Sequence, residues 1–235
     1  MTRARPVIAI DGPAGSGKST AARLLAKRLG YVLVDTGALY RGVALVAREE
    51  GVAWGDGEAL GHLARRLRMD FAVQPDGTSR LRIDGRDRAD EIRSPAISQG
   101  ASQVSRHPQV RQALLDQQRS FGAEGGVVLE GRDIGTVVFP DAEVKVFLRA
   151  SPEERARRRV EELRGRGHPV AYEDTLEEIR RRDARDEDRA VAPLRAAEDA
   201  VILDTTELSI ERVVDALAEL VRARTDGRKR GSGPS

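Results

Sequence analysis

Residues 12–19, with the sequence GPAGSGKS, constrain the fold of this chain more than any other stretch. They match the phosphate-binding loop pattern G-x-x-x-x-G-K-[ST] at every fixed position. Glycines permit a turn with positive φ and let backbone N–H groups approach an anion closely. Lys18 is expected to reach the β- and γ-phosphates, and the Ser19 hydroxyl is expected to ligate Mg²⁺.

The residues on either side of the loop support this interpretation. The β-branched run at 7–11 predicts a buried strand, and the leucine spacing over 20–29 predicts a helix. Gly30 stands where the glycine that ends a helix belongs. A strand, a loop and a helix in this order predict a nucleoside triphosphate site, with ATP as the expected ligand.

The composition limits the classes of protein that remain. With 235 residues, 40% of them hydrophobic, the chain suits one α/β domain with insertions. No apolar run approaches the ~18 residues of a membrane span, and the amino terminus lacks the apolar region of a signal peptide. Aromatic residues make up only 3%, which leaves few stacking platforms for nucleic acid. We therefore expect a cytoplasmic monomer that binds neither membranes nor nucleic acid.

Predicted strands alternate with predicted helices along the chain. The strands are expected at 7–11, 31–34, 127–129, 144–148 and 201–204. Further helices are expected up to about residue 50, at 56–68, as one or two helices over 94–120, and after a Ser209 cap. This alternation predicts an α/β fold with a five-stranded parallel doubly wound sheet and right-handed crossovers.

Two segments are expected to leave this core. Alternating apolar residues and the turn signals at 75–77 and 84–85 predict a small antiparallel β insert, a hairpin or three strands, at about 69–93. Two arginine-rich helices are predicted over 151–190. A Ser151–Glu154 capping box opens the first, and the second begins near Asp174 or Thr175. Such a pair is typical of a helical lid that closes over polyphosphate.

Charged residues follow the predicted strands where these end. Arg41 follows the second strand, and Glu130, Arg132 and Asp133 follow the third. Ligands of open parallel sheets bind beyond the carboxyl ends of the strands, and arginine grips phosphate with two hydrogen bonds. Solvated surface arginines and an ordinary Arg–Asp surface pair are the alternative interpretations.

The phosphate loop by itself does not separate a kinase from a motor or a switch. Neither the D-x-x-G switch motif nor the N/T-K-x-D guanine motif of GTPases is visible. The phosphate loop is expected to hold a donor, and the further arginines are expected to hold an acceptor phosphate. This arrangement favours phosphoryl transfer between two nucleotides.

From about residue 7 to 221 the chain resembles the bacterial cytidylate kinases. The stretches that carry the resemblance are IDGPAGSGKST, DTGALYR, ASQVSRHPQVRQALL, EGRDIGTVVFPDA, RRDARDEDRAVAPL and DTTELSIE. The resemblance implies phosphorylation of CMP and dCMP by ATP with Mg²⁺ as cofactor. It also implies a single P-loop kinase domain over 1–225, with an NMP-binding region at about 36–120 and a lid at about 151–190. The tail at 226–235 is expected to be a disordered basic segment.

The resemblance also implies a role for each matching residue. ATP is expected to contact Gly12, Pro13, Ala14, Gly15, Ser16, Gly17, Lys18, Ser19 and Thr20. The CMP phosphate would meet Arg41, Arg132 and Arg189, the sugar Arg182 and Asp186, and the cytosine Ser102, Arg111 and Asp133. Thr36 completes the expected CMP site at a position where relatives often carry serine. The residues expected to act in catalysis are Lys18, Arg158, Arg159 and Arg182.

The chemistry of cytosine agrees with this assignment. The exocyclic amine of cytosine donates a hydrogen bond that Asp133 can accept, whereas uracil presents a carbonyl there. Arg111 can donate to the ring nitrogen and carbonyl of cytosine. The alternatives are a kinase for UMP, dTMP or shikimate, and a non-enzymatic NTP-dependent switch or RNA-associated protein that uses the basic tail.

Overall fold

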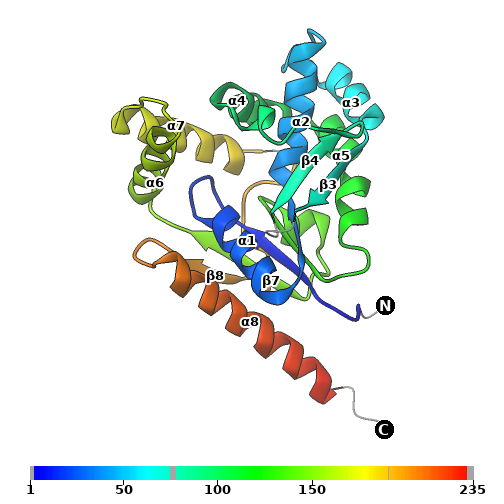
Figure 1. The fold of residues 1–235 in the computed structure, drawn as a ribbon, viewed down its shortest axis with the longest axis vertical. Coiled ribbons are helices and arrows are strands. Elements are labelled where there is room, and N and C mark those ends of the chain that lie inside the picture. The colour runs from blue at the N-terminus through cyan, green and yellow to red at the C-terminus, as the bar shows by residue number, and fades with distance from the viewer. Residues whose placement is uncertain (1–2, 75–77, 190, 232–235) are drawn as a thin grey trace.

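Figure 1 shows the computed structural model of the chain, which describes residues 3–74, 78–189 and 191–231. The central sheet has the strand order β2 (Val32–Asp35), β6 (Val127–Gly131), β1 (Val7–Asp11), β7 (Val144–Arg149) and β8 (Val201–Asp204). Every neighbouring pair of these strands is parallel. The predicted five-stranded parallel sheet is therefore confirmed.

Helices cover both faces of this sheet, which makes it doubly wound. On one face Ile8 and Ile10 pack with α1 (Lys18–Leu29) and α8 (Ile210–Gly231). On the other face Val7 and Ala9 pack with η2 (Ile134–Val138), a single π-helical turn. The central strand β1 is buried along its whole length, as a strand with helices on both sides must be.

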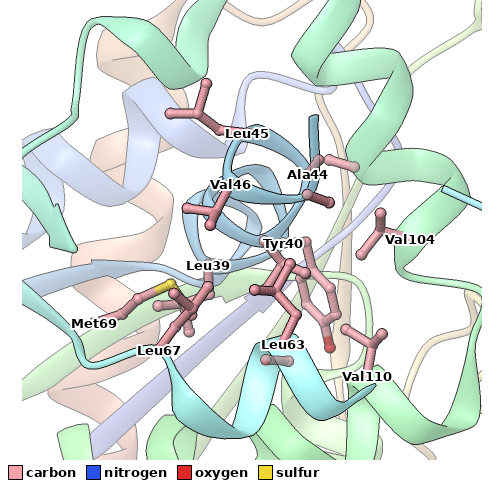
Figure 2. Close-up of a cluster of buried hydrophobic side chains, with 14 of the residues drawn as sticks. Leu39, Tyr40, Ala44, Leu45, Val46, Leu63, Leu67, Met69, Val104 and Val110 are labelled. Atoms are coloured by element: carbon pink, nitrogen blue, oxygen red, sulfur yellow. The ribbon is translucent and has the colours of Figure 1, made fainter. Parts of the chain in front are cut away.

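The remaining helices form two groups beyond the carboxyl ends of the strands (Figure 1). The first group comprises α2 (Thr36–Glu49), α3 (Gly57–Arg66), η1 (Glu91–Arg93), α4 (Pro95–Val104) and α5 (Pro108–Phe121). These elements enclose their own apolar cluster around α2, drawn in Figure 2. The second group is the pair α6 (Pro152–Gly165) and α7 (Tyr172–Glu187), at the predicted lid.

A three-stranded antiparallel sheet confirms the predicted insert. It consists of β3 (Met69–Val73), β4 (Ser79–Ile83) and β5 (Arg86–Asp87). Asp84 and Gly85 both have positive φ, +50° and +78°, as the tight turn between β4 and β5 requires. The other expected turn, at 75–77, lies outside the described residues.

Local chemistry accounts for most of the helix boundaries. The 94–120 segment forms two helices, because Pro108 has no N–H to continue the preceding helix and instead opens α5. Ser151 caps α6, its Oγ accepting from the Glu154 N–H at 3.2 Å. The return bond of a capping box does not form, since the Ser151 N–H donates to the Thr206 hydroxyl at 3.1 Å.

Two helix boundaries differ from the sequence-based predictions. The second helix of the predicted lid begins at Tyr172, before the expected Asp174 or Thr175, and ends at Glu187, so that Arg189 lies beyond it. Thr175 does not cap this helix, because its hydroxyl donates to the Ala171 carbonyl at 2.7 Å within the first turn.

The last helix is also longer than expected. α8 extends to Gly231, into the segment predicted to be disordered from Asp226. Arginine and lysine are good helix formers, and a helix that is already nucleated extends at little cost. Residues 232–235 of the expected tail lie outside the described residues. Within the described part of the chain, no helix has the length and apolar character needed to cross a membrane.

Candidate active site

The loop at 12–17 has the backbone of a phosphate-binding loop. Gly12, Gly15 and Gly17 have φ values of +149°, +77° and +86°, which side chains rarely tolerate. A Cβ atom on Gly12 would lie 2.1 Å from the Leu148 carbonyl oxygen, so the loop rests directly on β7. Helix α1 begins at Lys18 with Gly17 as its cap, and among the described residues no side chain caps its first N–H groups.

Lys18 and Ser19 lie where the loop meets the helix. The buried Lys18 ammonium donates to the Pro13 carbonyl at 2.8 Å. The Ser19 hydroxyl donates to Glu130 Oε2 at 2.7 Å, at the end of β6. Burial lowers the pKa of Lys18, and burial together with the Asp35 carboxylate raises the pKa of Glu130.

Several cationic side chains gather around Lys18 and Ser19. Burial and the neighbouring Arg132 lower the pKa of Arg182 to about 10, and Arg41 and Arg159 act in the same direction. Burial and Arg132 likewise lower the pKa of Lys18, with a smaller effect of Arg182. Within the described residues, the buried Nε atoms of Arg41 and Arg182 have no hydrogen-bond partner. Like charges gathered in this way favour a polyanionic ligand.

Asp186 of α7 forms ion pairs with two of the arginines that are expected to bind phosphate. Its carboxylate accepts from Arg132 Nε at 3.2 Å and from Arg189 Nη2 at 2.5 Å. Burial raises the pKa of Asp186, but Arg132 and Arg189 outweigh this effect and hold it below its ordinary value. Because Arg189 lies beyond the helix end, this pair also fixes the chain that leaves α7.

The residues expected to bind the base form a buried group beside this cluster. Arg111 Nη2 donates to Asp133 Oδ2, and its guanidinium lies 5.6 Å from the centre of the Tyr40 ring. Arg111 Nη1 also donates to the Ser105 carbonyl, and the Ser105 hydroxyl accepts from Arg189 Nη2 at 3.1 Å. Arg189 thus connects the residues expected to bind the base with those expected to bind the phosphate.

Ser102 is placed in the same region through α4. The Ser105 hydroxyl lies 3.3 Å from the Ser102 carbonyl, one helical turn away. Within the described residues, the buried Ser102 Oγ has no hydrogen-bond partner. Since a buried hydroxyl without a partner is costly, this atom is suited to a polar group of a ligand.

Three further expected site residues also have partners within the protein. The Thr36 hydroxyl donates to the Glu130 carbonyl at 2.7 Å and so ties α2 to β6. Arg158 donates to the Thr205 carbonyl at 2.5 Å and to Glu154 at 2.8 Å. Arg159 pairs with Glu162 on the same helix at 2.8 Å.

Asp35 and Asp11 were not among the residues singled out from the sequence. Asp35 caps α2 by accepting from the Ala38 N–H at 3.1 Å and holds Arg41 at 2.5 Å. Asp11 accepts from the N–H groups of Ile134 and Gly135, and burial raises its pKa to about 7. Each aspartate ends a strand of the central sheet, as Asp11 ends β1 and Asp35 ends β2, and the same signal that drew attention to Glu130 could have identified both.

The family model and the curated proteins that match this chain carry the same family name. Residues 8–223 match the family model described as cytidylate kinase. A protein of Pelotomaculum thermopropionicum named cytidylate kinase is 51% identical over 218 residues, covering 93% of this chain and 96% of that protein. One of Pseudomonas syringae pv. tomato with the same name is 52% identical over 220 residues, covering 93% and 96%. Among solved structures, a gluconokinase from Sinorhizobium meliloti 1021 aligns with a TM-score of 0.51 at 16% identity, covering 99% of this chain and 100% of that one, which is a likeness of fold.

Proposed function

Because the chain belongs to the cytidylate kinase family, we propose that it transfers the γ-phosphoryl group of ATP to CMP and dCMP. The products are ADP and CDP or dCDP. The observation that carries the proposal is the cationic cluster of Lys18, Arg132 and Arg182 beside the buried Arg111–Asp133 pair. Such a site can bind a polyphosphate donor beside an acceptor that carries both a phosphate and a base.

The loop from Gly12 to Thr20 binds the donor. Its backbone N–H groups and the N-terminus of α1 face the β- and γ-phosphates, and Lys18 leaves the Pro13 carbonyl to contact them. The Ser19 hydroxyl and the Glu130 carboxylate are oxygen groups of the kind that Mg²⁺ prefers, and their 2.7 Å contact places them together. Ser19 would hold the ion directly and Glu130 through water. Bound Mg²⁺ would neutralise charge on the phosphates.

The acceptor phosphate is held by Arg41, Arg132 and Arg189. Asp35 orients the first of these arginines, and Asp186 orients the other two. An acceptor phosphate is already anionic at neutral pH, so the reaction requires no general base. Positioning and neutralisation of charge therefore account for the acceleration.

Transfer takes place between these two phosphates. An oxygen of the CMP phosphate forms a bond to the γ-phosphorus while the bond from that phosphorus to the β,γ-bridging oxygen breaks. ADP leaves with the bonding electron pair. Lys18, Arg158, Arg159 and Arg182 stabilise the charge that develops on the transferred group. Arg158 and Arg159 exchange their contacts with Thr205 and Glu162 for contacts with the donor phosphates.

The nucleoside of the acceptor is recognised on the other side of the cluster. Asp133 accepts from the cytosine amine, Arg111 donates to the ring, and Ser102 offers its free hydroxyl. Arg182 and Asp186 contact the sugar, and Thr36 belongs to the acceptor site at the start of α2. UMP is disfavoured because its carbonyl would face the Asp133 carboxylate, and two hydrogen-bond acceptors repel each other.

The proposal also covers the oligomeric state, the compartment and the partners of the enzyme. The enzyme acts as a monomer in the cytoplasm and binds neither nucleic acid nor a membrane. The near-balanced net charge of +2 and the 3% aromatic content support this part of the proposal.

The test is ADP production from ATP and Mg²⁺ with CMP, dCMP, UMP, AMP, GMP, dTMP or shikimate added separately. We expect strong responses to CMP and dCMP and a weak response to UMP. Equal responses to CMP and UMP would leave a pyrimidine nucleotide kinase and overturn the role of Asp133. A folded protein that binds ATP without any acceptor-dependent ADP would instead be a switch.

A further inference from the structure

Arg155 is a buried charge to which the proposed mechanism gives no role. It lies in the first turns of α6, and its side chain is 4% exposed, whereas Arg157 on the same helix is 55% exposed. A buried guanidinium is costly unless each of its donors finds an acceptor. Its partners therefore identify the parts of the molecule that it holds.

The acceptors of Arg155 come from three separate segments. Nε donates to the Ala150 carbonyl at 3.0 Å, at the junction of β7 and α6. Nη1 donates to the Ala14 carbonyl at 3.3 Å, within the phosphate loop. Nη1 and Nη2 together bind both carboxylate oxygens of Asp183 in α7, at 2.9 and 2.6 Å. A bidentate ion pair of this kind fixes the relative orientation of the two side chains as well as their distance.

The contact with the phosphate loop is close enough to set its shape. A Cβ atom on Gly15 would lie 3.0 Å from Arg155 Cβ and 3.1 Å from the Arg155 carbonyl oxygen. The start of α6 therefore packs against the loop with no room for a side chain. A shift of Arg155 would be transmitted to the N–H groups that face the donor phosphates.

The contact with α7 sets the rotation of that helix. Asp183 directly follows Arg182, and Asp186 lies on the same helical face as Arg182, four residues on. Holding the Asp183 carboxylate against Arg155 therefore aims Arg182 and Asp186 into the cationic cluster. Arg182 depends on this support, because its Nε has no hydrogen-bond partner within the described residues.

We propose that Arg155, through Ala14 and Asp183, is a positioning residue that aligns the phosphate loop with Arg182 for phosphoryl transfer. This inference rests on the proposed function. Arg155 touches neither substrate. It acts by keeping the lid helix α7 at a set rotation and distance relative to the loop, since small displacements of charged groups cost large factors in rate.

The test compares Asp183→Asn, Arg155→Lys and Arg155→Met with wild type. Asp183→Asn keeps the size of the side chain but removes its charge. Arg155→Lys keeps the charge but loses the planar guanidinium that makes two parallel hydrogen bonds. We expect kcat with CMP to fall about 10- to 100-fold in each variant. For Asp183→Asn, the Kd of ATP measured without acceptor should change less than about threefold, because the loop contact of Arg155 survives.

The matched control is Arg157→Met on the exposed face of α6. Arg157 pairs only with the nearby Glu154 and Glu161 of its own helix among the described residues. Its removal should leave kcat within about twofold of wild type. Thermal melting of every variant identifies any that does not fold, and Asp183→Asn, at a less buried position than Arg155, carries the test if Arg155→Met does not.

A double-mutant cycle with Arg182→Met separates positioning from general stabilisation. If Asp183 acts through Arg182, adding Asp183→Asn to Arg182→Met should lower kcat less than about twofold further. An equal loss in both backgrounds would overturn the inference, as would folded Asp183→Asn and Arg155→Lys proteins with wild-type kcat. A wild-type protein that makes no CDP from ATP and CMP would overturn the proposed function and this inference with it.

Discussion

Asp11 Oδ2 accepts a hydrogen bond from the Gly135 N–H at 2.7 Å, while Oδ1 accepts from the adjacent Ile134 N–H at 2.8 Å. This carboxylate directly precedes the phosphate loop, and the two N–H groups directly follow Asp133. One side chain thus joins the segment expected to bind the donor to the residue expected to read the base. Its replacement should affect acceptor binding although it contacts no acceptor.

We predict that Asp11→Asn raises the KM for CMP about tenfold, with a smaller change in the KM for ATP. Asparagine can accept only one of the two N–H bonds, and its own amide donors face the other N–H. The Asp133 backbone then loses its anchor. Initial-rate kinetics with each substrate varied in turn provide the measurement. A KM for CMP equal to that of wild type would contradict the role of this contact.

The same aspartate predicts a pH dependence of stability. Burial raises its pKa from 3.8 to about 7, so between these values the folded state binds more protons at Asp11 than the unfolded state does. Stability contributed by the protonated form is therefore present below about pH 4 and is lost as pH rises towards 7. Urea unfolding from pH 5 to 8 should show wild type losing about 1–3 kcal/mol relative to Asp11→Asn. A pH-independent difference would contradict the shift.

Asp133→Ala should change base selectivity rather than only the rate. Its loss removes the proposed acceptor for the cytosine amine and leaves the buried Arg111 without its carboxylate partner. We expect kcat/KM for CMP to fall about 100-fold or more and that for UMP to fall much less. Parallel assays with the two nucleotides measure the ratio. Asp70→Asn, which breaks an exposed pair with Arg82 in the insert, is the control and should leave the ratio unchanged.

Glu130→Gln and Ser19→Ala should both raise the Mg²⁺ concentration needed for half-maximal activity, by about 10-fold. The 2.7 Å hydrogen bond between these residues orients the hydroxyl and places the carboxylate beside it. Mg²⁺ titrations at saturating ATP and CMP test both variants.

Gly12→Ala should prevent ATP binding and destabilise the fold by about 3 kcal/mol or more. The new methyl group would lie 2.1 Å from the Leu148 carbonyl oxygen, and the φ of +149° is unfavourable for alanine. Gly165→Ala is the matched control, since a Cβ there meets nothing within 4 Å at the end of α6. That variant should gain up to about 1 kcal/mol. Calorimetric binding of ATP and thermal melting distinguish the two glycines.

Much of this architecture follows from local sequence. The positive φ values of the loop glycines, the β4–β5 turn at Asp84 and Gly85 and the Ser151 cap are each specified by a few neighbouring residues. Two boundary predictions that rested on weaker local signals were wrong. The start of α7 and the extension of α8 differ from expectation because backbone hydrogen bonding continued a helix where the side-chain signals suggested a boundary.

The phosphate loop, the alternation of strands and helices and the position of charged residues after the strands can all be predicted from local sequence, because they depend on backbone preferences and apolar spacing. Which of the charges meet depends on how the elements pack. Ser19 reaches Glu130 because β6 pairs with β1, and Arg155 reaches Asp183 because α6 and α7 pack together. Such pairs join residues far apart in the chain, and their partners are chosen by the strand order and helix packing that bury the whole core.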